Sequence, residues 1–217
     1  MREFKTASLA DQVFERLEND IIVGNYQRGE ILTELKLVEQ LGVSRTPIRE
    51  ALRRLEQERL IEDTGKGSVV LGITEEDLED IMDIRISVEG LASYYAAQNA
   101  TAETSAELTH IMDLQDFYYS KRDYERLRQM DDSFHDQICN MGKRSVIRDT
   151  LVPLHRKTRR YRKISIQNEE RLIRMVEEHK DIYNAVVSGN AELAKALTEK
   201  HIANAKANMT ERMHKNG

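Results

Sequence analysis

The chain has 217 residues, with 33 Lys and Arg against 38 Asp and Glu, which gives a formal net charge of −5 at pH 7. This length accommodates one large or two small domains with hydrophobic cores. Hydrophobic residues make up 40% and charged residues 33% of the chain, with both signs interspersed, which excludes a disordered polyelectrolyte. The sequence contains no apolar run near the roughly 18 residues that a membrane span needs, so we expect no membrane association.

The N-terminal segment and the cysteine content indicate a compartment. Residues 1–10 carry charges with no apolar stretch behind them, so we expect no secretory signal. The single cysteine, Cys139, excludes an intrachain disulfide, and we expect the protein in the reducing cytoplasm. Only 2 Pro and 10 Gly interrupt a chain rich in helix-forming residues, which predicts a mainly α fold.

The first 72 residues alternate helical patterns with extended pieces. The predicted elements are a helix from Leu9 to near Gly24, an extended piece over residues 29–32, a helix over residues 34–41, a helix that begins within residues 44–46, and a two-stranded hairpin over residues 62–72. Thr33 and Gly42 are typical residues for the start and the end of the second helix. Pro47 is tolerated only in the first turn of a helix, so it fixes the start of the third helix.

From Thr74 onward the extended pieces vanish and helical patterns continue. We therefore expect a first domain over residues 1–72 and a second, all-helical domain over residues 73–217. Five breaks divide the second domain, at Asn99–Thr101, Lys121–Asp123, Met141–Gly142, Gln167–Asn168 and Gly189–Asn190. They predict a bundle of six helices.

The segment LGVSRTPIREALRRL, residues 41–55, places a glycine-containing turn between two short amphipathic helices. This layout is typical of a helix-turn-helix, whose second helix enters the major groove of DNA. Residues 1–72 carry 11 Lys and Arg against 13 Asp and Glu, a net charge of −2, yet residues 44–54 hold four Arg and one Glu. Positive charge is therefore concentrated on the predicted recognition helix.

Arg45 and Arg49 are four residues apart, so they share one helix face, opposite the apolar stripe. An arginine near the start of such a helix can donate two hydrogen bonds to the O6 and N7 atoms of guanine. Thr46 offers a hydroxyl and a methyl group at the same end. The hairpin tip, Gly65-Lys66-Gly67, can reach a neighbouring phosphate or the minor groove. These residues predict a DNA-reading surface.

The segment GVSRTPIREALRRLEQERLI, followed by GKGSVV, resembles the winged-helix domain of the GntR family of bacterial transcription regulators. The second half is similar to the FCD type of effector domain found in the FadR subfamily, and its six predicted helices resemble the VanR-like branch. The resemblance implies a winged helix-turn-helix with DNA contacts at Arg45, Thr46, Arg49, Lys66 and Gly67. One departure is Leu35, which stands where many relatives carry an arginine.

Three histidines and one aspartate of the second domain are spaced so that they can converge. Asp131 and His135 are four residues apart on one helix and share a face. His179 lies ten residues before Gly189 and His201 eleven after Asn190, so on two antiparallel helices both lie about 15 to 17 Å from the turn. A lone inward histidine is usually a hydrogen-bonded core residue. Four together suit a divalent cation such as Zn, Ni, Mn or Fe, and in the FCD family an Asp and three His form such a site.

Arg85 falls on an apolar helical stripe, which predicts a buried guanidinium group that needs an anionic partner. Two partners remain open: Glu89, one turn further along, and the carboxylate of a bound effector. His110, His155 and His214 have no partner at a useful spacing. We therefore expect Arg85 as the effector-binding residue of the second domain.

The sequence as a whole predicts a DNA-binding transcription regulator that responds to a small organic acid. Two-fold operators are inverted repeats of double-stranded DNA, and each half-site needs its own DNA-binding domain, so we expect a homodimer. We expect no catalytic residues and no enzyme activity. Two alternatives stay open: a metal-dependent hydrolase or lyase fused to a DNA-binding module, and a regulator that senses the metal itself.

Overall fold

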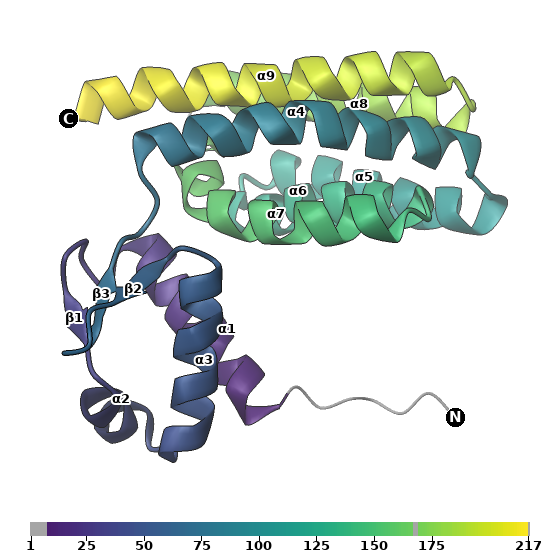
Figure 1. Cartoon of the computed structure of the whole chain (residues 1–217). Helices are drawn as coiled ribbons and strands as arrows, with labels where there is room; N and C mark the ends of the chain where they lie inside the picture. Colours follow the sequence, from purple (N-terminus) through teal and green to yellow (C-terminus); the bar gives the residue numbers. More distant parts are fainter. Residues whose placement is uncertain (1–7, 167–168, 217) are drawn as a thin grey trace, which may run out of the picture. The chain divides into compact units, whose positions relative to one another are not determined.

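The computed structural model describes residues 8–166 and 169–216, and within them the side chains other than those of residues 159–166, 169 and 212–216. The predicted break at Gln167–Asn168 and the side chain of His214 lie outside this described part. The chain divides into two compact units, Met1–Thr74 and Glu75–Gly217. Both units are mainly helical (Figure 1), and the prediction of a mainly α fold is confirmed.

From residue 8 onward, where the structure describes it, the first unit has three helices and three short strands. In chain order they are α1 (Leu9–Val23), β1 (Ile31–Leu32), α2 (Glu34–Leu41), α3 (Arg45–Gln57), β2 (Ile61–Asp63) and β3 (Ser68–Val70). The side-chain oxygen of Thr33 accepts a hydrogen bond from the backbone N–H of Lys36, and Gly42 ends α2 in the left-handed conformation. Both ends of α2 therefore follow from the residues that predict them.

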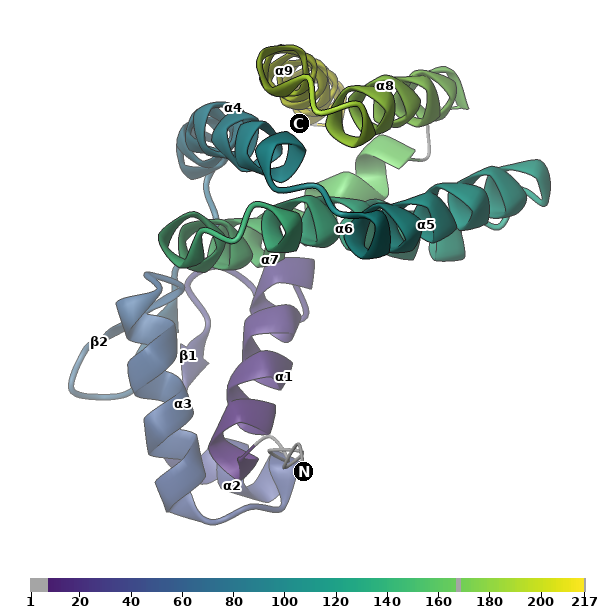
Figure 2. The ribbon, with the colours of Figure 1, turned by 90° about the vertical axis from the view of Figure 1, so that its right-hand side faces the viewer.

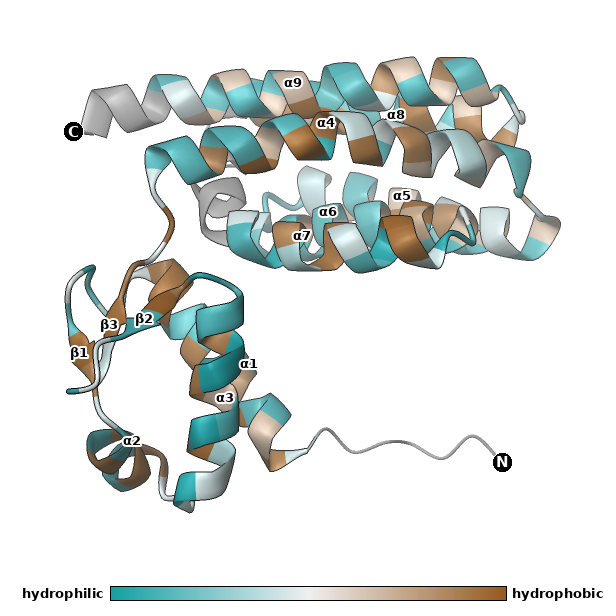
Figure 3. Ribbon diagram, in the orientation of Figure 1, coloured by the Kyte–Doolittle hydropathy of each residue, from teal (hydrophilic) through white to brown (hydrophobic). Residues whose placement is uncertain are grey.

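The hairpin prediction was incomplete, because the extended piece before α2 joins the sheet. The strand order is β1-β3-β2, and both pairings are antiparallel. Ile31 pairs with Val69, while Ile61 pairs with Val70. In Figure 3, β1 and β3 are hydrophobic, whereas α3 carries several hydrophilic bands. The wing of this winged helix-turn-helix is therefore a three-stranded sheet rather than a free hairpin.

The core of the first unit joins all of its helices to the sheet. Phe14 and Leu17 of α1, Leu37 of α2 and Leu55 of α3 are almost completely buried, as is Val70 of β3. Burying a side chain of this size stabilises a fold by about 1.5 to 3 kcal/mol. The apolar face of α3 is thus used for packing, and its opposite face is left at the surface.

The second unit contains six helices within its described residues. They are α4 (Glu75–Gln98), α5 (Ala102–Ser120), α6 (Tyr124–Met141), α7 (Ser145–Ile166), α8 (Glu169–Val187) and α9 (Ala191–Asn216). Figures 1 and 2 show two layers in this unit: α4, α9 and α8 form one, and α7, α6 and α5 form the other. The predicted six-helix bundle is confirmed.

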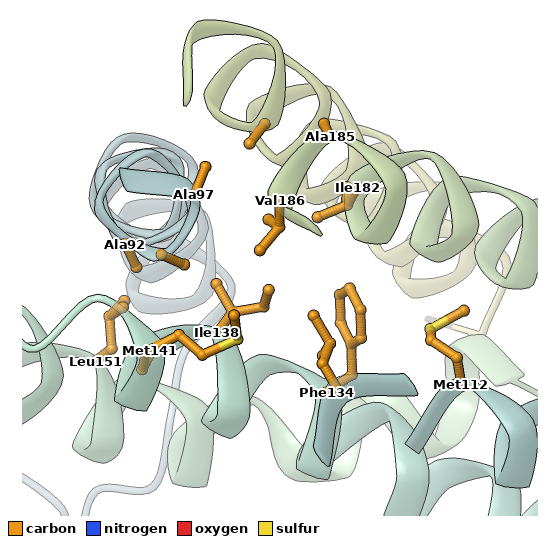
Figure 4. Close-up of a cluster of buried hydrophobic side chains, with 14 residues drawn as sticks. Ala92, Ala97, Met112, Phe134, Ile138, Met141, Leu151, Ile182, Ala185 and Val186 are labelled. Carbon is orange, nitrogen blue, oxygen red and sulfur yellow. The ribbon is translucent and has the colours of Figure 1, made fainter. Parts of the chain in front are cut away.

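A hydrophobic cluster fills the space between the two layers. Phe134 and Ile138 of α6 point toward Ile182 and Val186 of α8, and small alanines of α4 close one side (Figure 4). Phe134 is 1% exposed, and Leu151 of α7 is completely buried. Small residues of α4 allow its close contact with α9: a Cβ atom on Gly90 would lie 2.7 Å from Cγ of Glu199, and Ser93 accepts a hydrogen bond from Thr198 over 2.7 Å. Among the described residues, the helices are too short or too polar to cross a membrane.

Candidate nucleic-acid interface and candidate metal centre

Helix α3 turns its polar residues outward. Arg45, Thr46 and Arg49 are exposed, whereas Ile48 and Leu55 on the opposite face are completely buried. Ser44 precedes the helix in an extended conformation, and Pro47 lies in its first turn. The predicted recognition helix therefore presents two arginines and a threonine at its N-terminal end, where base contacts are made in helix-turn-helix proteins.

Arg49 has a partner within the same unit. Its Nε atom donates to Oε1 of Glu34, at the start of α2, over 2.7 Å. This hydrogen bond lowers the pKa of the Glu34 carboxyl group below its usual value. Arg54 has a different role, because its Nη1 atom lies 2.6 Å from Oδ1 of Asp11 and its guanidinium group 3.9 Å from the ring centre of Phe14. Arg54 thus fixes α3 to α1, while Arg49 stays at the surface.

The wing tip lies beside the recognition helix. Lys66 is exposed between β2 and β3, and it lines a groove together with Arg49 and Arg53 of α3. Gly67 has a φ of 141°, and a Cβ atom there would lie 2.8 Å from Cγ2 of Ile31. The close approach of β1 therefore requires a glycine at position 67, which is a structural reason independent of DNA.

Leu35 is 58% exposed at the start of α2. An apolar side chain contributes no hydrogen bond to a phosphate or a base. Leu35 thus presents an exposed apolar side chain next to Glu34 in the sequence.

Four potential metal ligands meet in the second unit, between the two layers of helices. Asp131 and His135 come from α6, His179 from α8 and His201 from α9. All four are buried, and each offers one ligand atom within 4.8 Å of the others. The Nε2 atoms of His179 and His201 are 3.3 Å apart, so these two residues face each other as their equal distances from the α8–α9 turn predict.

Carboxylates outside the cluster fix two of the imidazole rings. Nδ1 of His135 lies 2.8 Å from Oε2 of Glu89, and Nδ1 of His201 lies 2.7 Å from Oε2 of Glu178. A carboxylate only accepts hydrogen bonds, so both Nδ1 atoms carry the proton. In a neutral imidazole the lone pair is then on Nε2, the atom that points into the cluster.

Gln115 of α5 fixes the third ring. Its amide nitrogen donates to the backbone carbonyl of Met130 over 3.3 Å, and its amide group contacts Nδ1 of His179, with Nε2 at 3.0 Å and Oε1 at 3.1 Å. The ring of His179 also stacks on Phe134, with 4.1 Å between ring centres. Gln115 thus occupies Nδ1 of His179, and Nε2 is the ring nitrogen that faces His201.

This donor set fits a divalent cation. Two imidazole lone pairs that face each other at 3.3 Å repel unless a proton or a cation lies between them. Burial, followed by the nearby His201, lowers the pKa of His179 well below its usual value, so the ring is neutral and keeps one nitrogen lone pair for a metal ion. Nitrogen and carboxylate ligands suit Zn, Ni, Mn or Fe. The residues present therefore fit a bound metal ion.

Arg85 lies beside this cluster. It contacts Glu89, one of the two partners that the sequence left open. Nε of Arg85 donates to Oε1 of Glu89 over 2.6 Å, and both side chains are 2 to 3% exposed. Burial alone would raise the pKa of Glu89, but Arg85, His135 and His155 together hold it well below its usual range. Arg85 also lines a small cavity next to Asp131 and His135.

His155 corrects one expectation from the sequence. We expected it to have no partner, but its Nε2 atom lies 3.0 Å from Oε1 of Glu89, which in turn contacts His135. The reason is tertiary: α7 packs against α4 and brings a histidine to a glutamate 66 residues away. His110, in contrast, is exposed on α5.

Sequence reasoning missed the residues that orient the ligands. Glu89 was considered only as a partner of Arg85, one helical turn away. Gln115 and Glu178 gave no signal, because each acts through a contact between helices rather than through a spacing within one. Arg171 was also missed: it is buried and pairs with Glu178, seven residues further along α8, over 2.8 Å.

A winged helix-turn-helix unit joined to a helical bundle with a buried ligand cluster defines a class of DNA-binding regulators. Residues 9–70 match the family described as bacterial regulatory proteins, gntR family, and residues 80–204 match the FCD domain. The chain belongs to the GntR family and carries an FCD domain.

Similar proteins agree with this assignment. The gluconate operon transcriptional repressor of Bacillus licheniformis is 32% identical over 65% of this chain and 58% of its own length. The HTH-type transcriptional regulator YdhC of Bacillus subtilis is 27% identical over 85% of this chain and 83% of its own length. Both are named as regulators of transcription rather than enzymes, so the hydrolase or lyase alternative finds no support.

The solved structure of E. coli McbR/YncC has the same fold. Its TM-score is 0.78, with 22% identity over 96% of this chain and 100% of that chain. The match to the gluconate repressor, by comparison, spans little more than half of that relative's length.

Proposed function

We propose that the chain regulates transcription by binding operator DNA with its first unit, under the control of a small carboxylate effector held near a divalent metal ion in the second. The observation that carries this proposal is the combination of an exposed pair of arginines on α3 with a buried cluster of four convergent metal ligands. The first feature suits a large polyanionic partner, and the second suits a small cation.

The DNA part of the proposal assigns base recognition to Arg45, Thr46 and Arg49. Lys66 and the backbone of Gly67 contact a phosphate or the minor groove. All four side chains concerned are exposed, and Arg49 and Lys66 line one groove. A helix of this size reads only a few base pairs, so a homodimer on an inverted repeat supplies the second half-site. The protein acts in the cytoplasm, where its operator is.

The metal part assigns Asp131, His135, His179 and His201 as ligands of one ion. This assignment is supported by Glu89 and Glu178, which hold His135 and His201 in the tautomer that a metal requires, and by Gln115, which contacts Nδ1 of His179. When bound, such an ion supplies positive charge and Lewis acidity to an effector carboxylate. Arg85 lines the adjacent cavity, and its guanidinium group supplies hydrogen bonds to the same effector.

Selection of operator sequences tests the proposal. The full chain is incubated with a pool of random double-stranded DNA, and bound sequences are enriched over several rounds. We expect an inverted repeat to emerge, and the Arg45→Ala variant to fail to enrich it. Elemental analysis of the same preparation gives the metal content, which we expect to be one ion per chain. Absence of enrichment contradicts the DNA part, and absence of metal contradicts the metal part.

A further inference from the structure

The groove between the recognition helix and the wing tip is not uniformly basic. It has a volume of about 440 Å³, and the charged residues of its walls are Glu34, Arg49, Arg53, Glu56, Asp63 and Lys66. Three carboxylates thus stand beside three cationic groups. A surface that binds DNA only through phosphates gains from each positive charge and loses from each carboxylate. The carboxylates therefore call for an explanation other than phosphate binding.

Two of these carboxylates support the backbone of the wing. Oε1 of Glu56 accepts a hydrogen bond from the backbone N–H of Asp63 over 3.4 Å, and Oδ1 of Asp63 accepts one from the backbone N–H of Gly65 over 2.8 Å. Glu56 thus joins α3 to β2, and Asp63 shapes the hairpin tip. Glu34 differs from both, because it accepts a hydrogen bond from the side chain of Arg49.

The start of α2 fixes the position of the Glu34 carboxylate. Thr33 caps this helix, with its Oγ1 atom accepting from the backbone N–H of Lys36 over 3.3 Å, and Glu34 is the first residue after the cap. The hydrogen bond from Arg49, and further the charges of Arg49 and Arg45, lower the pKa of the Glu34 carboxyl group. An ionised carboxylate therefore lies beside both arginines of the DNA-reading face.

The contact with Glu34 determines which edge of the Arg49 guanidinium group faces a further partner. A guanidinium group has five N–H donors, one on Nε and four on the two Nη atoms. Glu34 accepts at Nε over 2.7 Å, so the edge formed by Nη1 and Nη2 is left to bind DNA. Two donors on one edge match O6 and N7 of guanine. Arg49 is 64% exposed, and without Glu34 its long side chain could turn toward any nearby phosphate.

We propose that Glu34 is a positioning residue for sequence recognition: it holds Nε of Arg49 and thereby aims the Nη1–Nη2 edge of that side chain at a guanine. The inference rests on the proposed function above and deepens it, because it adds a specificity residue that contacts no base itself. Phosphate contacts are common to all duplexes, so the effect of Glu34 is on the preference for the operator over random DNA.

Two substitutions of Glu34 separate its hydrogen bond from its charge. Binding of the full chain to the selected operator and to a random duplex of equal length is measured by fluorescence anisotropy at one salt concentration. We expect Glu34→Ala, which removes the acceptor, to lower the ratio of operator affinity to random affinity by about fivefold or more. Glu34→Gln keeps an oxygen that can accept from Nε, so we expect it to recover most of this loss. If the two variants behave alike, only the charge matters and the inference is wrong.

An Arg49→Ala background tests whether Glu34 acts through Arg49. Once the guanidinium group is absent, a residue that only positions it has nothing left to position. We therefore expect Glu34→Ala to change the affinity ratio by less than about twofold in this background. An equal fall of the ratio in both backgrounds overturns the inference.

Glu39→Ala is the matched control, because Glu39 is exposed on the same helix. It removes one negative charge, and we expect the affinity ratio to stay that of the parent; a fall as large as that of Glu34→Ala contradicts the inference.

Melting temperatures of all variants are compared, since an acidic residue in the first turn of α2 also stabilises the helix. If Glu34→Ala weakens binding to operator and random DNA by the same factor, Glu34 only stabilises the fold and the inference is wrong. If the parent chain prefers no sequence, the proposed function has failed, and the inference falls with it.

Discussion

The two units place their charged groups in opposite environments. On α3, Arg45 and Arg49 are at the surface, and Arg49 pairs with the half-buried Glu34. Around the ligand cluster, Glu89 alone accepts hydrogen bonds from Arg85, His135 and His155, all of them buried. An exposed ion pair is worth about 0 to 1 kcal/mol and is easily exchanged for a phosphate or a base. A buried network is costly to disturb, which suits a site that must hold one small ion in a fixed geometry.

The largest effect is expected from removal of a ligand in the buried cluster. Replacing a residue that only hydrogen-bonds to a metal ligand typically lowers metal affinity 10- to 100-fold. We therefore expect His179→Ala, which removes a ligand itself, to lower it by more than about 100-fold. At free metal about 100-fold above Kd, the parent gains about 2.7 kcal/mol of stability, which corresponds to several degrees of melting temperature. Calorimetry with Zn²⁺ and thermal melts with and without a chelator measure both quantities.

His110→Ala is the control for this experiment, since His110 is exposed on α5. His155→Ala is not a neutral control, because His155 contacts Glu89. A His179→Ala variant with the metal affinity of the parent would show that the cluster is only a polar core.

A smaller effect is expected at the exposed face. Replacing Arg45 or Arg49 with Ala should weaken binding to the selected operator by about 1 to 3 kcal/mol and flatten the preference for it over random DNA. Fluorescence anisotropy with both duplexes measures the two affinities. Arg54→Lys, on the same helix but packed against Phe14, is the comparison variant. Equal losses on operator and random DNA would contradict base recognition by Arg45 and Arg49.

Acidification should act on the buried site and spare the surface. His179 has a lowered pKa in the fold, so below about pH 6.5 the unfolded chain binds more protons than the folded chain, and stability falls. Glu178, with a pKa of about 2, acts in the same direction below about pH 4.5. We expect the melting temperature of the metal-free protein to fall between about pH 7.5 and pH 5.5. In His179→Asn that fall should be shallower, and an unchanged pH profile would contradict the role of His179.

The smallest effect is expected at the wing tip. Lys66→Ala removes one exposed positive charge, so operator and random DNA should weaken by a similar, few-fold factor. If Lys66 contacts a phosphate, the slope of log affinity against log salt becomes shallower by about 0.9. A loss confined to the operator would instead assign Lys66 to sequence recognition.

Local signals predicted most of the fold. The bounds of α2 follow from Thr33 and Gly42, and the start of α3 follows from Pro47. The pairing of β1 with β3 was missed because Ile31 and Val69 are 38 residues apart and no local pattern links them. A spacing within one helix is visible in a sequence, whereas strand pairing depends on the packed unit.

The same distinction explains the candidate site. Asp131 and His135 are linked by helical spacing, and His179 and His201 by a tight turn, so their convergence was predictable. The partners of the ligand histidines were not predictable, because Gln115, Glu178 and Glu89 act across helix contacts. The guanidinium group of Arg85 was predicted to be buried, but its contact with Glu89 needed the structure.

Helix α4 links the ligand cluster to the segment that leads into the first unit. It carries Arg85 and Glu89 at the ligand cluster, and its first residue, Glu75, follows β3 of the wing after only four residues. Glu89 is 14 residues from that end, a stiff arm of about 21 Å. A tilt of about 5° about Glu89 would displace the start of the arm by roughly 2 Å. A tilt of α4 at the ligand cluster would therefore move the segment that leads into the first unit.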